Sequence, residues 1–343
     1  MTDAAPQMLD FTTEVRRATA PIYRKLRHVV PEIEWPVHAP YVAAINELKG
    51  KLNAIVLAHN YQTPEIFGGV ADLTGDSLAL ARQASETDAE IILLCGVHFM
   101  AETAKLLSPH KTVLLPDLEA GCSLASSITA EDVRSLRARY PGAPVVTYVN
   151  TSADVKAETD ICCTSANAVE IVESLPEDRV IFLPDEYLGR WVQTQTEKEL
   201  ILWEGHCEVH ERFTGAEIRG YRELHHDLVV LAHPECPPDV LAEADFVGST
   251  AKMSAYVDEH RPKRAFLVTE CSMSDNVALD HPEVEFLRPC NLCPHMKRIT
   301  LPKILRSLQT GTHAIEIESG IARRARRAVE RMMDFQTVSA TSH

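Results

Sequence analysis

Three cysteines recur along the chain at almost constant spacing and form its most specific chemical pattern. Cys122, Cys207 and Cys293 are 85 and 86 residues apart. Each follows an apolar stretch and lies in a polar or Gly/Pro-containing segment, in EAGCS, WEGHCEVH and CNLCPHM. Free cysteines are usually buried as small apolar side chains, but three thiolates at one point would suit an iron–sulfur cluster or zinc. The spacing favours a shared metal site with one ligand from each third of the chain.

The other cysteines compete for that role. Cys290 forms a C-x-x-C pair with Cys293, which is typical of half a zinc site or of a redox pair. A closed four-cysteine zinc site is not expected, because the sequence has no second C-x-x-C. We expect the remaining cysteines to be buried: Cys95, Cys162, Cys163, Cys236 and Cys271. A four-iron cluster held by three cysteines leaves one iron open, as a Lewis-acid catalyst requires.

Polar side chains follow three apolar runs at matching positions. The runs are Ile55–Ala58, Val145–Val149 and Leu228–Ala232. The polar residues at or just beyond their ends are His59, Tyr61, Tyr148, Asn150, His233 and Glu235. Ligands of open parallel sheets bind beyond the carboxyl ends of the strands, and histidine, tyrosine and glutamate can transfer protons. A single histidine is more often structural, but this matched set predicts a substrate site.

A second landmark, GDS, CTS or GST, follows each run. We expect its hydroxyl residues to open helices: Ser77, Ser165, Ser249 and Thr250. A hydroxyl there commonly caps the helix, and a helix N-terminus also binds anions. Three such termini around one cavity would hold a substrate with several carboxylate or phosphate groups. His210 lies three residues after Cys207 and is expected to reach the same cavity.

These residues need a scaffold that is repeated three times. Apolar runs alternate with helical patterns, which indicates βαβ units and parallel sheets, and an internal repeat decides the architecture. We predict an α/β fold of three homologous βα-repeat domains with small parallel sheets around a pseudo-threefold axis. The predicted domains span residues 1–120, including an N-terminal helical extension, 121–207 and 208–295.

The two ends of the chain are predicted to be helical. Pro31, Pro36 and Pro40 are expected to break the N-terminal extension before the first strand. The stretch Pro64–Leu73 is expected to form a helix after that strand. One or two helices are expected within residues 296–343, packed on the first domain.

Composition excludes several classes of function. The chain has 343 residues, 45% of them hydrophobic, which suits a globular protein with more than one core. Its net charge of −15 argues against general nucleic-acid or membrane-surface binding. It has no signal-peptide-like or membrane-spanning apolar run, so we expect a cytoplasmic protein. In that compartment nine cysteines indicate metal or redox chemistry rather than disulfides.

The motifs in order closely resemble those of the quinolinate synthase family. The matching pieces cover roughly residues 52–305 and are LAHNYQ with PEI, GDSL, GVHFMAETAK, LP-x-x-x-A-x-C, YVN, CTSAN, W-x-G-x-C-x-V-H, HPEC, GST and C-P-x-M. The resemblance implies three α/β domains around a [4Fe-4S] cluster bound by Cys122, Cys207 and Cys293. It also implies condensation of iminoaspartate with dihydroxyacetone phosphate to quinolinate, with release of phosphate and two waters.

The resemblance also implies individual roles. The open iron would polarise an oxygen or nitrogen of the intermediate, while Glu235 and Tyr61 would handle protons, with His210 close to the chemistry. The implied substrate contacts are His59, Ser77, Tyr148, Asn150, Ser165, His233, Glu235 and Thr250, to which the residue pattern adds Ser249. The implied partners are the two small-molecule substrates, with functional coupling to an iminoaspartate-producing aspartate oxidase, and neither nucleic acid nor membrane.

The chain departs from some relatives, and two other functions remain open. Some relatives carry three cysteines near the C-terminus, whereas this chain has Cys290 and Cys293, with Leu287 at the first position. This departure argues against the relatives' redox-switching disulfide, while a Cys290–Cys293 pair stays open as an alternative. The alternatives are another [4Fe-4S] hydro-lyase that acts on a small hydroxy acid, and a non-catalytic metal-binding regulatory protein.

Overall fold

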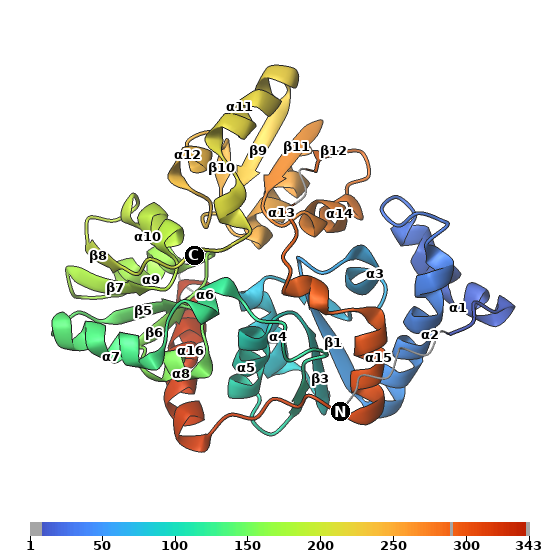
Figure 1. Ribbon diagram of the computed structural model, residues 1–343, viewed down its shortest axis with the longest axis horizontal. Helices are drawn as coiled ribbons and strands as arrows, with labels where there is room; N and C mark the ends of the chain where they lie inside the picture. Colours follow the sequence, from blue (N-terminus) through green and yellow to red (C-terminus); the bar gives the residue numbers. More distant parts are fainter. Residues whose placement is uncertain (1–8, 289–290, 341–343) are drawn as a thin grey trace.

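The fold consists of three four-stranded parallel sheets that share one strand order. The structure is a computed structural model that describes residues 9–288 and 291–340. In each sheet the first strand lies between the second and the third, and the fourth lies at the far edge. The first sheet contains β2 (Leu73–Gly75), β1 (Ala54–His59), β3 (Ile91–Cys95) and β4 (Thr112–Leu114). Figure 1 shows three such units arranged around a common centre, which confirms the predicted fold class.

The other two sheets repeat this order with their own strands. The second sheet contains β6 (Ile161–Cys163), β5 (Val145–Tyr148), β7 (Arg179–Leu183) and β8 (Glu199–Leu202). The third contains β10 (Phe246–Val247), β9 (Leu228–Ala232), β11 (Arg264–Val268) and β12 (Glu285–Leu287). Each sheet falls within one of the three predicted domains, whose boundaries remain a prediction.

The inner strands of each sheet form where the sequence is largely apolar, because helices cover both faces of a parallel sheet. Val56, Ile92, Val146 and Phe182, for example, are fully buried. Crossover helices join successive parallel strands. The first unit contains α2 (Trp35–Leu52), α3 (Pro64–Phe67), α4 (Ser77–Glu86) and α5 (His98–Leu107), preceded by α1 (Thr13–Leu26).

The helices of the second and third units follow the same alternation. The second unit contains α6 (Ser123–Ser126), α7 (Ala130–Arg139), α8 (Ala153–Ala157), α9 (Ala168–Ser174) and α10 (Glu186–Gln193). The third contains a short 3₁₀ turn (His210–Arg212), α11 (Gly215–Leu224), α12 (Pro238–Leu241), α13 (Thr250–His260) and α14 (Ser272–Ala278). A second 3₁₀ turn (Met296–Arg298), α15 (Leu301–Thr310) and α16 (Ser319–Ala340) end the described chain.

One arrangement of an ion pair recurs at matching positions in all three units. The aspartate directly before each second strand accepts the N–H of a residue in the first strand, 2.8 Å away. It also binds a cation from the helix that precedes the first strand. The same cation donates to a carbonyl two residues before the aspartate. The three cation–aspartate pairs are Lys49–Asp72, Arg137–Asp160 and Arg222–Asp245. This shared geometry supports an internal triplication.

Two local predictions in the first unit are wrong. Pro36 and Pro40 lie inside α2 instead of breaking the chain before it. Pro36 stands in the first turn, where its missing N–H is tolerated. The helix expected over residues 64–73 ends at Phe67, and Leu73 begins β2, which pairs with β1. Sheet pairing outweighs the local helical pattern there.

The C-terminal helices join two units. The first of them, α15, packs on α2 of the first unit. The long α16 packs against α5 and also against α8 and β6 of the second unit, a placement that the sequence did not predict (Figure 1). No helix in the described part of the chain is long and apolar enough to cross a membrane.

Candidate active site

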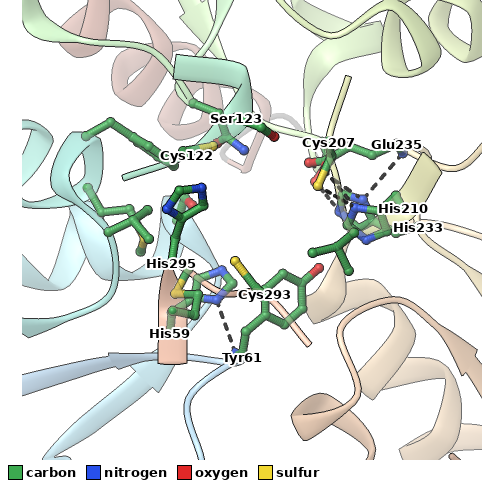
Figure 2. A pocket seen from close by; sticks show the side chains of 18 of the residues that line it. His59, Tyr61, Cys122, Ser123, Cys207, His210, His233, Glu235, Cys293 and His295 are labelled. Atoms are coloured by element: carbon green, nitrogen blue, oxygen red, sulfur yellow. Dashed lines mark hydrogen bonds and ion pairs between the residues drawn. The ribbon is translucent and has the colours of Figure 1, made fainter. Parts of the chain in front are cut away.

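A cavity lies where the three units meet, beyond the carboxyl ends of their first strands. It holds about 730 Å³ of space free of protein atoms, counting the part open to solvent. Figure 2 shows side chains from all three units around it. The predicted site residues that line it are His59, Tyr61, Ser77, Cys122, Tyr148, Asn150, Ser165, Cys207, His210, His233, Glu235, Thr250 and Cys293. The structure therefore brings all but one of the predicted site residues together.

Ser249 is the exception. It is the N-cap of α13, where its hydroxyl accepts the N–H of Lys252, so its role in the structure is helix capping. Ser77 and Thr250 each occupy the first helical position, and Asp76 caps the helix that Ser77 begins. Ser165 lies in a turn three residues before α9 rather than at its start.

The three cysteines reach the cavity from separate segments. Cys122 is the N-cap of α6, and Cys207 and Cys293 each lie three residues before a 3₁₀ turn. Figure 2 shows them on different sides of one space. Burial raises the pKa of the Cys122 thiol to about 12 and also raises the pKa of Cys207 and Cys293. Without a metal these thiols are protonated at neutral pH, so metal binding would release protons.

Two histidines of the cavity, His59 and His233, are neutral, and both have the same tautomer. His59 Nδ1 accepts the N–H of Tyr61 at 3.1 Å, and His233 Nδ1 accepts the N–H of Glu235 at 3.4 Å. Burial lowers the pKa of each histidine to about 3. Because a backbone N–H can only donate, the ring proton of each lies on Nε2. His233 Nε2 donates to Ser165 Oγ at 3.1 Å.

Glu235 is the buried anionic centre of the site. Tyr148 Oη donates to its Oε1 at 2.6 Å, and His210 Nδ1 lies 2.9 Å from its Oε2. Burial alone would raise the pKa of Glu235, but His210 and the Tyr148 hydroxyl outweigh burial and hold this pKa well below its ordinary value. Glu235 is therefore ionised at neutral pH and can accept a proton.

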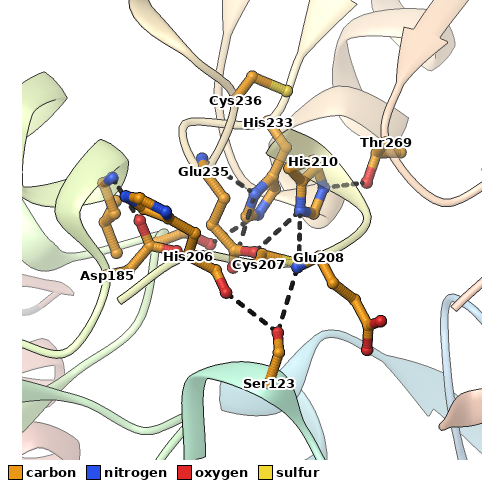
Figure 3. Close-up of polar contacts among 12 residues, drawn as sticks. Ser123, Asp185, His206, Cys207, Glu208, His210, His233, Glu235, Cys236 and Thr269 are labelled. Carbon is orange, nitrogen blue, oxygen red and sulfur yellow. Dashed lines mark hydrogen bonds and ion pairs between the residues drawn. The ribbon is translucent and has the colours of Figure 1, made fainter. Parts of the chain in front are cut away.

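A chain of polar groups connects Tyr61 to Glu235. Tyr61 Oη lies 2.5 Å from Thr269 Oγ1, which lies 2.9 Å from His210 Nε2. The other ring nitrogen of His210 faces Glu235, as Figure 3 shows. Burial raises the pKa of Tyr61 well above its ordinary value, so its phenol keeps its proton. The four groups provide a continuous hydrogen-bonded path along which a proton can move.

One mixed donor set in the site is close enough to hold a metal ion. A sulfur, a nitrogen and an oxygen of Cys207, His210 and Glu235 lie within 4.8 Å of one another. His210 Nδ1 is 3.1 Å from Cys207 Sγ. Such a set can bind a borderline-soft metal. It overlaps the three-cysteine set through Cys207, so both belong to one site.

Some site residues were not predicted from the sequence. Asp76, Ser123, Thr164, Glu208 and His295 also line the cavity. Glu208 and His295 form an ion pair of 2.9 Å between the segments that carry Cys207 and Cys293. Several of the missed residues adjoin a predicted one in sequence, which is the signal that could have found them. Thr269, which connects Tyr61 to His210, was also not predicted, and neither residue next to it in the sequence was a predicted site residue.

The remaining cysteines largely behave as predicted. Cys95, Cys162, Cys163 and Cys236 are buried. Cys271 is only half-buried, contrary to the prediction, because it stands at the N-cap of α14 outside the sheet. Cys290, and with it the C-x-x-C interpretation, lies outside the described residues.

Comparisons with known proteins identify the family. Residues 43–334 match the model of the family described as Quinolinate synthetase A protein. The chain is 66% identical to quinolinate synthase 2 of Mesorhizobium japonicum, over 93% of this chain and 98% of that protein. It is 59% identical to the quinolinate synthase of Sinorhizobium fredii, over 96% and 91% of the two chains. The chain is thus an enzyme of the Quinolinate synthetase A protein family.

Proposed function

We propose that this enzyme condenses iminoaspartate with dihydroxyacetone phosphate to give quinolinate, phosphate and two waters. The observation that carries the proposal is the meeting of Cys122, Cys207 and Cys293 in one cavity with buried proton-transfer groups. The family membership and the names of the relatives support the same reaction.

The cofactor that we propose is a [4Fe-4S] cluster held by the three cysteines. Three of the described residues that line the cavity are cysteines, and all three are soft sulfur donors. A closed zinc site of four cysteines would need one more thiol there. When bound through three thiolates, such a cluster supplies one open iron as a Lewis acid. The residues of the chain therefore fit the cofactor.

The chain's own donors can hold the carboxylates of the substrates. His59 and His233 present neutral Nε2–H groups, and the hydroxyls of Ser77, Ser165 and Thr250 line the same cavity. Asn150 Oδ1 is buried and has no hydrogen-bond partner among the described residues, so a substrate N–H or O–H would satisfy it. Each of these neutral groups can donate a hydrogen bond to a carboxylate oxygen.

Proton handling falls to Glu235 and to the Tyr61–Thr269–His210 path. The condensation removes C–H and N–H protons and protonates departing hydroxyls, so it needs both a base and an acid. Glu235 is ionised and can take a proton from bound substrate, while Tyr61 Oη can return one through Thr269 and His210. Glu235 and His210 are buried, which shields the Glu235 end of the path from water.

The first substrate implies a partner reaction. An imine of aspartate hydrolyses in water, so it must be supplied by an enzyme that oxidises aspartate nearby. We propose that such an aspartate oxidase is functionally coupled to this enzyme and that this enzyme is cytoplasmic.

A product assay tests the function. The anaerobically purified enzyme should form quinolinate only when iminoaspartate and dihydroxyacetone phosphate are both present. Dehydration of a small hydroxy acid without a triose phosphate would instead indicate a hydro-lyase. Absence of any substrate-dependent turnover in a metal-loaded protein would indicate a regulatory metal-binding protein.

A further inference from the structure

A buried ion pair outside the cavity connects two parts of the site. Lys297 Nζ lies 2.8 Å from Glu270 Oε1, and the Glu270 side chain is fully buried. Neither residue lines the cavity. Burial raises the pKa of Glu270, and the Lys297 ammonium offsets part of this effect. A buried pair of this kind often contributes little net stability compared with apolar residues, so its contacts need another explanation.

Lys297 directs its three N–H groups to separate partners. Besides Glu270, it donates to the Tyr61 carbonyl at 2.6 Å and to Ser272 Oγ at 2.8 Å. Its own backbone N–H donates to the Cys293 carbonyl at 3.1 Å. One side chain therefore ties the segment after Cys293 to the loop of Tyr61 in the first unit and to the third unit.

Glu270 completes the connection from the other side. Its Oε1 also accepts the N–H of Cys293 at 3.3 Å, and its Oε2 accepts the N–H of Ser272 at 2.9 Å. Glu270 directly follows Thr269, the residue that bridges Tyr61 and His210. The position of Cys293, the backbone of Tyr61 and the partner of the Tyr61 hydroxyl thus depend on the same pair.

We infer that Glu270 and Lys297 are positioning residues that set the Cys293 thiol and the Tyr61 hydroxyl in one fixed geometry. The inference rests on the proposed function only for its effect on turnover. Its effect on Cys293 is independent of any cofactor, because the hydrogen bonds exist in the protein alone. The two consequences can therefore be measured separately.

The matched control for Lys297 is Lys49. Lys49 is also a largely buried lysine that binds a carboxylate, Asp72, at 2.8 Å and a carbonyl, that of Val70, at 2.7 Å. It lies in α2, and none of these three residues lines the cavity. A Lys49→Met variant removes the same chemistry without touching Cys293 or Tyr61.

The test measures alkylation of individual cysteines in the full-length protein without cluster, by mass spectrometry. Lys297→Met should raise the alkylation rate of Cys293 by about tenfold, because the loop opens more often once its ties are lost. Cys122 serves as the internal reference and should not change. In Lys49→Met the ratio of the Cys293 alkylation rate to the Cys122 alkylation rate should equal the wild-type ratio. This should hold even if Lys49→Met lowers the melting temperature as much as Lys297→Met does.

The double variant Glu270→Gln/Lys297→Met separates position from stability. It leaves no unpaired buried charge, so it should unfold at a higher temperature than Lys297→Met. If the pair positions the site, the alkylation rate of Cys293 stays above the wild-type value in the double variant, as in Lys297→Met. The reconstituted double variant should also have a lower kcat than the wild type, with KM nearly unchanged. Wild-type reactivity of Cys293 in both variants would overturn the inference. An inactive wild-type enzyme would instead contradict the proposed function and leave the alkylation result standing.

Discussion

His59 and His233 have the same hydrogen-bond arrangement in two different units. In each, Nδ1 accepts the backbone N–H of the residue two positions later, Tyr61 or Glu235. The arrangement places the ring proton on Nε2. Since both rings are buried with a pKa near 3, the site presents neutral imidazoles at physiological pH. The repeat therefore gives the cavity two neutral imidazoles with the same tautomer, and that of His233 donates to Ser165.

The first prediction concerns the pH dependence of stability. His59 has a folded pKa of about 3 against an ordinary value of 6.5. Below pH 6.5 His59 binds a proton in the unfolded chain but not in the native state. The unfolding free energy therefore falls as the pH drops towards 3. The loss is up to about 1.4 kcal/mol per pH unit for this histidine.

Urea unfolding of the cluster-free protein at a series of pH values measures this effect. The glutamine of His59→Gln does not titrate, so this variant lacks the contribution of His59 to the pH dependence. Its unfolding free energy should therefore decline less steeply than that of the wild type between pH 6 and 4. Parallel pH curves for the two proteins would show that His59 is protonated in the native state.

Glu235 is predicted to be essential for turnover and not for metal binding in the three-cysteine site. Glu235→Gln keeps the shape and accepts the Tyr148 hydrogen bond, but it cannot act as a base. We expect kcat to fall by about 10²- to 10⁴-fold, with iron content unchanged. Steady-state kinetics and metal analysis of the same preparation check both parts. An unchanged rate would remove Glu235 from the mechanism.

Thr269 is predicted to act through its hydroxyl. Thr269→Val has nearly the same shape but interrupts the path between Tyr61 and His210. Its kcat should fall by about 10²-fold or more, whereas Thr269→Ser should retain most activity. Equal activity of the Val and Ser variants would mean that Tyr61 and His210 act without the connection that Thr269 provides.

Ser249 is predicted to affect stability alone. Loss of an N-cap hydroxyl costs about 1 kcal/mol, so Ser249→Ala should melt at a lower temperature with unchanged KM. The neighbouring Thr250 lines the cavity and binds Asn60 Nδ2 at 2.9 Å, so Thr250→Val should raise KM. A raised KM in Ser249→Ala would show that Ser249 contributes to substrate binding after all.

The sequence predicted the parts of the site that repeat locally. His59, Tyr148 and His233 each mark the end of an apolar run, and such runs are strands wherever helices cover them. Even so, the expected helix extends to Leu73 and misses the strand Leu73–Gly75, because the short segment Leu-Thr-Gly becomes a strand only through its pairing with β1.

Contacts between units could not be predicted in the same way. Thr269 follows β11 without any distinguishing pattern, and its partners are residues 61 and 210. The Glu270–Lys297 pair likewise forms only because the C-terminal segment returns to the first and third units. Such contacts depend on how three sheets pack, which a one-dimensional pattern does not contain.

The most direct test of the account counts iron and sulfide in anaerobically purified protein. The wild type should contain about four of each per chain. Cys122→Ala, Cys207→Ala and Cys293→Ala should each lose most of both, whereas Cys236→Ala, a buried cysteine outside the cavity, should retain them. Near-stoichiometric zinc in the wild type, or four irons retained in all three variants, would contradict a cluster shared by the three units.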